Sequence, residues 1–107
     1  MKIKGIMTHH ITKKDADIKI VLDQYLPNLS ETSILIITSK IISICEGNII
    51  PIDEGDKDEL IQKEADLYIP RSKSKYNVCL TITRGILAPS AGIDESNADN
   101  HYILRLS

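Results

Sequence analysis

The apolar positions near the start of the chain recur with a helical period. Four of them stand at positions i, i+3, i+4 and i+7 of one segment: Ile18, Val21, Leu22 and Tyr25. This spacing lines one face of an α-helix. Acidic residues stand early in the segment and Pro27 follows it, as is typical of a helix start and a helix stop. The pattern predicts an amphipathic helix over residues 15–26, opened by Asp15 or Lys14.

Other segments have the pattern of β-strands. Alternating or continuous apolar positions mark six of them: residues 2–7, 33–37, 48–52, 76–83 (or 78–83), 86–88 and 101–107. The second is a continuous aliphatic run, which is typical of central strands, and Pro51 interrupts the third. Arg84 and Gly85 separate the fourth from the fifth, so a β-hairpin with glycine at its turn is predicted there.

Residues 38–47 fit a strand as well as a helix by propensity alone. Thr38 or Ser39 can cap the start of a helix. Gly47 can take the left-handed conformation that ends one. These flanking residues favour the helix.

The chain has the size and composition of one domain. A second, weaker helix is predicted from Asp56 or Asp58 to Leu67. No repeat, low-complexity tract or linker interrupts the 107 residues, and the 42% of hydrophobic residues can supply a core. We therefore predict a single α+β domain over residues 1–107, with a mixed β-sheet and two or three short helices.

Charge and hydropathy argue against two classes of partner. The formal net charge is −2, which gives no electrostatic footprint for a nucleic acid or for an anionic membrane. The longest apolar run, residues 34–37, is far shorter than the roughly 20 residues of a spanning helix. We expect a soluble, cytoplasmic protein that binds neither nucleic acid nor membrane.

Cysteines and histidines are not spaced as metal ligands. Cys45 and Cys79 stand far apart in the sequence, and buried free thiols are the favoured interpretation. His9 and His10 are adjacent and would face opposite sides of a strand, so they cannot hold one ion together. Both are expected at the surface. His101, beside a polar loop, could orient a ligand or simply be exposed.

The Thr38-Ser39-Lys40 segment is the first candidate for chemistry. It lies where a predicted strand feeds a predicted helix. Hydroxyl groups, a cation and unpaired backbone N–H groups at such a point suit an anion. The alternative is a plain cap with a solvated lysine. The pattern of a P-loop is not present in the segment.

Residues 90–97 are the second candidate. Small residues there let backbone approach a ligand closely. Asp94 and Asn97 add hard oxygen donors, which suit Mg²⁺ or Mn²⁺ together with a phosphate. The alternative is an Asx-rich turn that joins two strands.

These segments carry a resemblance to a known family. The matching residues are Gly5-Ile6, the segment 36–43 followed by Glu46-Gly47, and the Ala-Gly-Ile-Asp-Glu-Ser-Asn string at 91–97. With these residues the chain resembles the N-terminal half of the coenzyme F420-0:L-glutamate ligases, over essentially its whole length.

The resemblance implies a GTP-dependent ligase. Such an enzyme activates a carboxylate as an acyl phosphate and joins it to L-glutamate by a γ-linked amide, with Mg²⁺ or Mn²⁺ at the phosphates of GTP. By resemblance Asp94 is a metal ligand and Asn97 contacts the nucleotide. Six further residues would line the GTP site: Gly5, Ile6, Met7, Thr8, Ser39 and Lys40. The acceptor would be coenzyme F420-0 or a folate-like molecule, and the resemblance assigns no catalytic residue. We also expect a homodimer.

Three differences from the family keep a second function open. Ile44 stands where family members usually have a lysine that contacts GTP, and the region between Gly47 and Cys79 is shorter. The chain also stops at Ser107 as though cut, without the family's second half, so we expect apolar surface that promotes self-association. The alternative to a ligase is a non-catalytic nucleotide- or metal-binding module, or an assembly module, on the same scaffold.

Overall fold

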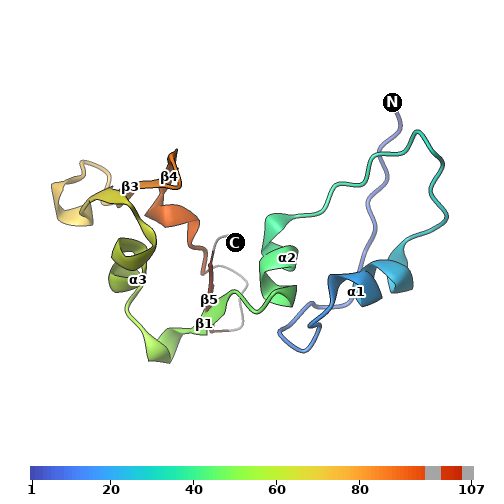
Figure 1. Cartoon of the computed structure of the whole chain (residues 1–107), viewed down its shortest axis with the longest axis horizontal. Helices are drawn as coiled ribbons and strands as arrows, with labels where there is room; N and C mark the ends of the chain where they lie inside the picture. The colour runs from blue at the N-terminus through green and yellow to red at the C-terminus, as the bar shows by residue number, and fades with distance from the viewer. Residues whose placement is uncertain (96–99, 105–107) are drawn as a thin grey trace. The chain divides into compact units, whose positions relative to one another are not determined.

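The computed structural model describes residues 1–95 and 100–104 (Figure 1). Its contacts divide the described chain into an N-terminal unit, residues 1–48, and a C-terminal unit that begins at residue 49. Three α-helices and two antiparallel sheets, of two and three strands, make up the described regular structure together with short 3₁₀ turns. The α+β class predicted from the sequence is confirmed.

The first helix of the N-terminal unit is α1, Ile18–Tyr25. Its cap is Asp17, whose carboxylate accepts a hydrogen bond from the backbone N–H of Lys19 at 2.8 Å. Val21 is buried on its apolar face. The helix predicted at this place is confirmed, but it starts later than Asp15, because the Asp15 carboxylate instead binds the backbone N–H of Thr12.

The second helix, α2, spans Ser39–Cys45 and follows Thr38 in extended conformation. Two residues after its end stands Gly47, which has a φ of +75°. The backbone N–H of Gly47 bonds to the carbonyl of Ile44, and that of Asn48 to the carbonyl of Ser43. This pair of bonds is the Schellman motif, which needs a left-handed residue at its centre. The helix predicted from Thr38 and Gly47 is confirmed.

Two predicted strands of this unit are wrong. Residues 2–7 and 33–37 have no regular secondary structure, and Ile34 and Ile36 are more than four-fifths exposed. The sequence pattern describes side chains that would suit a sheet, whereas a strand also needs a neighbour to complete its backbone hydrogen bonds. No strand pairing involves the described residues of the N-terminal unit.

Two antiparallel sheets form the C-terminal unit. The first pairs β1, Ile49–Pro51, with β5, His101–Ile103. The second has the order β2-β3-β4, with the bounds Leu67–Ile69, Leu80–Thr83 and Ile86–Pro89. The predicted strand at 48–52 and the predicted hairpin are confirmed. Arg84 and Gly85 both have positive φ at the hairpin turn, as a two-residue turn of the primed type requires.

Helix α3, Lys57–Glu64, connects the two sheets along the chain. The carboxylate of its cap, Asp56, accepts a hydrogen bond from the backbone N–H of Glu59 at 3.3 Å. The predicted start is confirmed, but the predicted end at Leu67 is wrong, because Leu67 pairs with Ile82 as the first residue of β2.

One cluster of buried side chains forms the core of the C-terminal unit: Ile61, Cys79, Ala91, Ile93 and Tyr102. Leu60 and Leu104 pack against it. Ile61 is completely buried, and burial of such a side chain stabilises a fold by about 1.5–3 kcal/mol. Cys79 here and Cys45 in the N-terminal unit are both buried free thiols, as predicted.

The α-helices of the described chain are seven or eight residues long. Over residues 1–95 and 100–104, none has the length and apolar composition needed to cross a membrane.

Candidate functional site

The first group of predicted site residues lies in the extended N-terminal segment. Gly5, Ile6 and Met7 are exposed, and Thr8 is half-buried. A Cβ built at Gly5 would meet no atom within 4 Å, so this glycine leaves open space above the backbone. The hydroxyl of Thr8 donates to the carbonyl of His9 at 2.9 Å. The segment therefore has exposed backbone at Gly5 and a hydroxyl at Thr8 that is already hydrogen-bonded.

Ser39 and Lys40 are the first two residues of α2. Ser39 is exposed and Lys40 is half-buried. Thr38 makes no side-chain cap bond to the helix, and N–H groups in the first turn of any helix lack partners within the helix. Ile44, which stands at the place of the family's second lysine, is buried on the interior side of the same helix. The cationic part of this unit's candidate site therefore depends on Lys40.

The second predicted segment begins with a backbone conformation that is rare for its residue types. Ser90, Ala91 and Gly92 have φ values of +53°, +52° and +74°, and the N–H of Ile93 bonds back to the carbonyl of Ser90 at 2.9 Å. We name these three residues the left-handed turn. A left-handed conformation costs a residue with a Cβ about 1–2 kcal/mol, and such strain is often kept where a site needs it.

A buried threonine holds the left-handed turn in place. The hydroxyl of Thr81, on β3, donates to the carbonyl of Ala88 and accepts the backbone N–H of Ala91 at 2.9 Å. The N–H of Ser90 bonds to the carbonyl of Cys79 at 2.7 Å. Thr81 and Ala91 are each 1% exposed. The backbone N–H groups of Ser90 and Ala91 are thus both hydrogen-bonded inside the unit, where an unpaired donor would be costly.

Asp94 follows the turn and is fixed by its backbone. Its N–H and carbonyl both bond to Ile103 of β5, at 3.0 and 2.6 Å. The residue is half-buried. Next to it, the Glu95 carboxylate forms a 3.0 Å ion pair with Lys57 at the start of α3. The left-handed turn and the backbone pairing with Ile103 together fix the point from which the Asp94 side chain extends.

The predicted metal ligand Asp94 does not belong to a cluster of potential metal ligands among the described residues. Within the part of the chain that the structure describes, no three acidic, histidine or cysteine side chains gather as a metal site would require. Mg²⁺ is commonly held by one or two carboxylates, with phosphates and water as its other ligands. A site at Asp94 would therefore need ligands from a bound phosphate or water in addition to this carboxylate.

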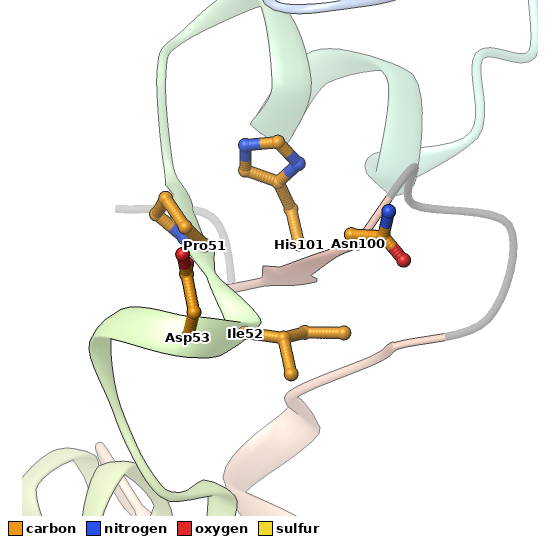
Figure 2. A pocket seen from close by; sticks show the side chains of 5 residues that line it. All are labelled: Pro51, Ile52, Asp53, Asn100 and His101. Atoms are coloured by element: carbon orange, nitrogen blue, oxygen red, sulfur yellow. The ribbon is translucent and has the colours of Figure 1, made fainter.

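A shallow pocket lies in the same unit, where β1 and β5 meet (Figure 2). Its volume is about 560 Å³, and five residues line it: Pro51, Ile52, Asp53, Asn100 and His101. The N–H of Ile52 bonds to the carbonyl of Asn100 at 2.9 Å. A carboxylate, an amide and an imidazole therefore stand at one opening. From the sequence, His101 could be either a ligand contact or simply an exposed residue. In the structure it lines this pocket.

The predicted residues are distributed over both units. Gly5 to Thr8, Ser39 and Lys40 belong to the N-terminal unit, and Asp94 belongs to the C-terminal unit. Asn97 lies outside the described residues. Sequence reasoning missed Thr81, since an alternating strand pattern marks it only as a polar residue on one face.

The chain was also compared with known proteins. No family model, no curated protein and no solved structure matches it.

Proposed function

We propose that this chain contributes nucleotide and metal ligands to a GTP-dependent γ-glutamyl ligase that adds L-glutamate to coenzyme F420-0 or to a folate-like acceptor. The observation that supports the proposal best is the left-handed turn directly before Asp94. Strained backbone that is held by a buried hydroxyl, and that leads into a fixed carboxylate, is typical of a ligand-binding segment. The same residues carry the resemblance to the ligase family.

The reaction would proceed in two balanced steps. An oxygen of the acceptor carboxylate attacks the γ-phosphorus of GTP, GDP leaves, and an acyl phosphate forms. The amine of L-glutamate then attacks the acyl carbon, phosphate leaves, and the amide bond forms with loss of a proton. Both steps are accelerated by positioned donors and cations that bind phosphate oxygens.

Within the N-terminal unit, the proposal assigns the nucleotide contacts. Lys40 supplies the positive charge, Ser39 supplies a hydroxyl and a backbone N–H at the start of α2, and Gly5 to Thr8 supply open backbone. In the C-terminal unit, Asp94 would hold Mg²⁺ or Mn²⁺, an ion that can supply positive charge in phosphoryl transfer. We place this activity in the cytoplasm.

Calorimetric titration with GDP and Mn²⁺ tests the proposal on the chain itself. We expect micromolar binding that requires the metal, and Asp94→Asn should weaken it at least about tenfold by removing the ligand charge. Glu64→Gln is the matched control, because it removes an exposed carboxylate from the same unit. Lys40→Met should weaken GDP binding in the presence of Mn²⁺ by removing a positive charge. Absence of any binding by the unaltered chain, or equal binding by Asp94→Asn, would overturn the proposal.

A second candidate function, an assembly module, is favoured by one face of the three-stranded sheet. Five residues on this face are aliphatic and exposed: Leu67, Ile69, Leu80, Ile82 and Leu87. Their register puts Ile82 between Leu67 and Leu87, and Leu80 beside Ile69. We name these five residues the apolar sheet face.

The occupant that best suits the apolar sheet face is a second copy of the chain. The face carries no charge, so it is complementary to another uncharged aliphatic face. The net charge of −2 gives little repulsion between two copies. Sheets that pack face to face interdigitate such side chains at a separation of about 10 Å. A homodimer is therefore proposed for either function.

A further inference from the structure

A hydrogen-bonded group of three side chains lies outside the predicted ligand residues, in the N-terminal unit. His9 contacts Asp15 through one ring nitrogen and Tyr25 through the other. The Nε2 atom is 2.8 Å from Oδ1 of Asp15, and the Nδ1 atom is 2.6 Å from the hydroxyl oxygen of Tyr25. We name these residues the His9 array. It links the segment before α1 to the last residue of that helix.

The hydrogen bonds of Asp15 decide how protons are placed in the array. The Oδ2 atom accepts the backbone N–H of Thr12 at 2.9 Å. This bond, and then the bond to His9, hold the pKa of the Asp15 carboxyl below its ordinary value. Asp15 is therefore ionised at neutral pH and accepts the proton on Nε2 of His9. In neutral His9 the Nδ1 atom then carries a lone pair, which accepts the hydroxyl proton of Tyr25.

Two further hydrogen-bond donors contact the Tyr25 oxygen. The backbone N–H of His9 donates to it at 2.9 Å, and the side-chain amide of Gln24 donates at 3.5 Å. Both donors would strengthen as negative charge develops on the oxygen. A phenol is also a stronger acid than an aliphatic alcohol, so its proton is transferred to an imidazole more easily than that of a serine.

The order nucleophile, base and orienting carboxylate is the geometry of an activated nucleophile. We infer that Tyr25 is a nucleophilic site for activated acyl donors, with His9 as its base and Asp15 as the residue that positions His9. In the step, the Tyr25 oxygen bonds to the acyl carbon and its proton passes to Nδ1 of His9. The bond from that carbon to the leaving group breaks, and the leaving group takes the proton from His9. The product is an O-acyl tyrosine.

The other tyrosines provide an internal comparison. Tyr76 is 77% exposed and Tyr68 is 45% exposed, whereas Tyr25 is half-buried. Tyr76 has the ammonium group of Lys75 over its ring, and no hydrogen bond from a histidine ring to Tyr68 or Tyr76 is found among the described residues. If exposure alone governed acylation, Tyr76 would react first. If the array governs it, Tyr25 reacts first.

The test is acetylation of the full chain by p-nitrophenyl acetate, followed by mass spectrometry of each tyrosine-containing peptide. Lability to hydroxylamine identifies the acetyl groups on tyrosine. We expect Tyr25 to react at least about tenfold faster than Tyr76, because base catalysis of this kind contributes factors of about 10²–10⁴. His9→Gln should lower the Tyr25 rate about tenfold or more and leave the Tyr76 rate unchanged. Asp15→Asn should lower the Tyr25 rate in the same way.

His10→Gln is the matched control and should leave every rate as it is. If Tyr25 reacts no faster than Tyr76 in the unaltered chain, the inference is wrong and the array is only a structural link. The same holds if His9→Gln keeps its helical circular dichroism and its Tyr25 rate. Should His9→Gln lose its helical signal, the comparison of tyrosines in the unaltered chain still decides, since it requires no variant.

Discussion

The hydroxyl oxygen of Thr81 accepts the backbone N–H of Ala91 at 2.9 Å, ten residues further along the chain. Both residues are buried, so the bond cannot be replaced by water without a rearrangement. Thr81→Val keeps the shape of the side chain and removes the hydroxyl. We expect it to lower the free energy of unfolding by about 1–3 kcal/mol, the cost of a buried donor left unpaired. Urea denaturation followed by circular dichroism measures this loss.

Thr81→Ser is the control for that experiment. It keeps the hydroxyl and removes one methyl group, which should cost about 1 kcal/mol or less. Equal losses in the two variants would mean that the methyl group, and not the hydroxyl, secures the left-handed turn.

The end of α2 supplies a second prediction. Gly47 has a φ of +75° and open space where a Cβ would stand. Gly47→Ala should therefore cost about 1–2 kcal/mol through backbone strain alone. Gly5 also has open space, but its φ lies outside the left-handed region. Gly5→Ala should change stability by less than about 0.5 kcal/mol. Thermal denaturation of both variants checks the pair, and a stable Gly47→Ala would contradict the Schellman ending.

The successful sequence predictions depended on local signals. Gly47 ends α2 and Asp56 caps the start of α3, and both signals lie within a few residues of the helix end that they mark. Thr38 precedes α2 as predicted but makes no side-chain cap bond. The hairpin at Arg84 and Gly85 is equally local. In contrast, residues 33–37 have a strong strand composition and form no strand, because pairing depends on a partner elsewhere in the chain.

In the candidate sites too, local features could be predicted from the sequence, whereas contacts between distant residues could not. The small residues at 90–92 indicated close backbone approach, but the left-handed conformation of Ser90 and Ala91 depends on Thr81, which no local pattern connects to them. The His9 array was missed because His9 was considered only together with His10, as a possible pair of metal ligands. Once residues 9–15 turn back along α1, His9 meets Asp15 and Tyr25. Only the fold brings these three side chains together.

Asp15 predicts how stability changes in acid. Its pKa is lowered first by the hydrogen bond from the N–H of Thr12 and then by His9. A carboxyl whose pKa is lower in the folded state stabilises the fold above the unfolded pKa of about 4, and this contribution is lost as the pH falls through the folded pKa. Asp15→Asn should therefore flatten the acid side of a stability-against-pH curve measured by circular dichroism. Asp23→Asn, on an exposed position of α1, should leave that side of the curve as it is.

The two thiols should react slowly in the folded chain. Burial raises the pKa of Cys45, and the nearby Asp15 and Asp17 raise it further. Burial also raises the pKa of Cys79, with Asp58 adding to the effect and Arg71 opposing it. Thiolate is the reactive form, so iodoacetamide should modify neither cysteine appreciably at pH 7 until urea unfolds the chain.

The raised pKa values of Cys45 and Cys79 also predict how the stability of the fold changes in alkaline solution. A thiol with a raised pKa binds its proton more tightly in the folded chain, so stability should fall as the pH rises above the unfolded pKa of about 8.5. Cys45→Ala and Cys79→Ala separate the two contributions. Rapid alkylation of the folded chain at pH 7 would show that the thiols are accessible.

The apolar sheet face makes a prediction about association. Leu87 lies on β4, opposite Ile82 of the central strand β3, and is 74% exposed. Leu87→Lys places a charge on the face, and a dimer that buried it would have to desolvate two unpaired ammonium groups, one from each copy. We expect the variant to be monomeric in light scattering at concentrations where the unaltered chain is a dimer. Ile86→Lys is the matched control, because Ile86 pairs with Thr83 on the opposite face of the sheet and is 53% exposed. A dimer that persists in Leu87→Lys, or one that is lost equally in Ile86→Lys, would exclude the apolar sheet face as the contact between copies.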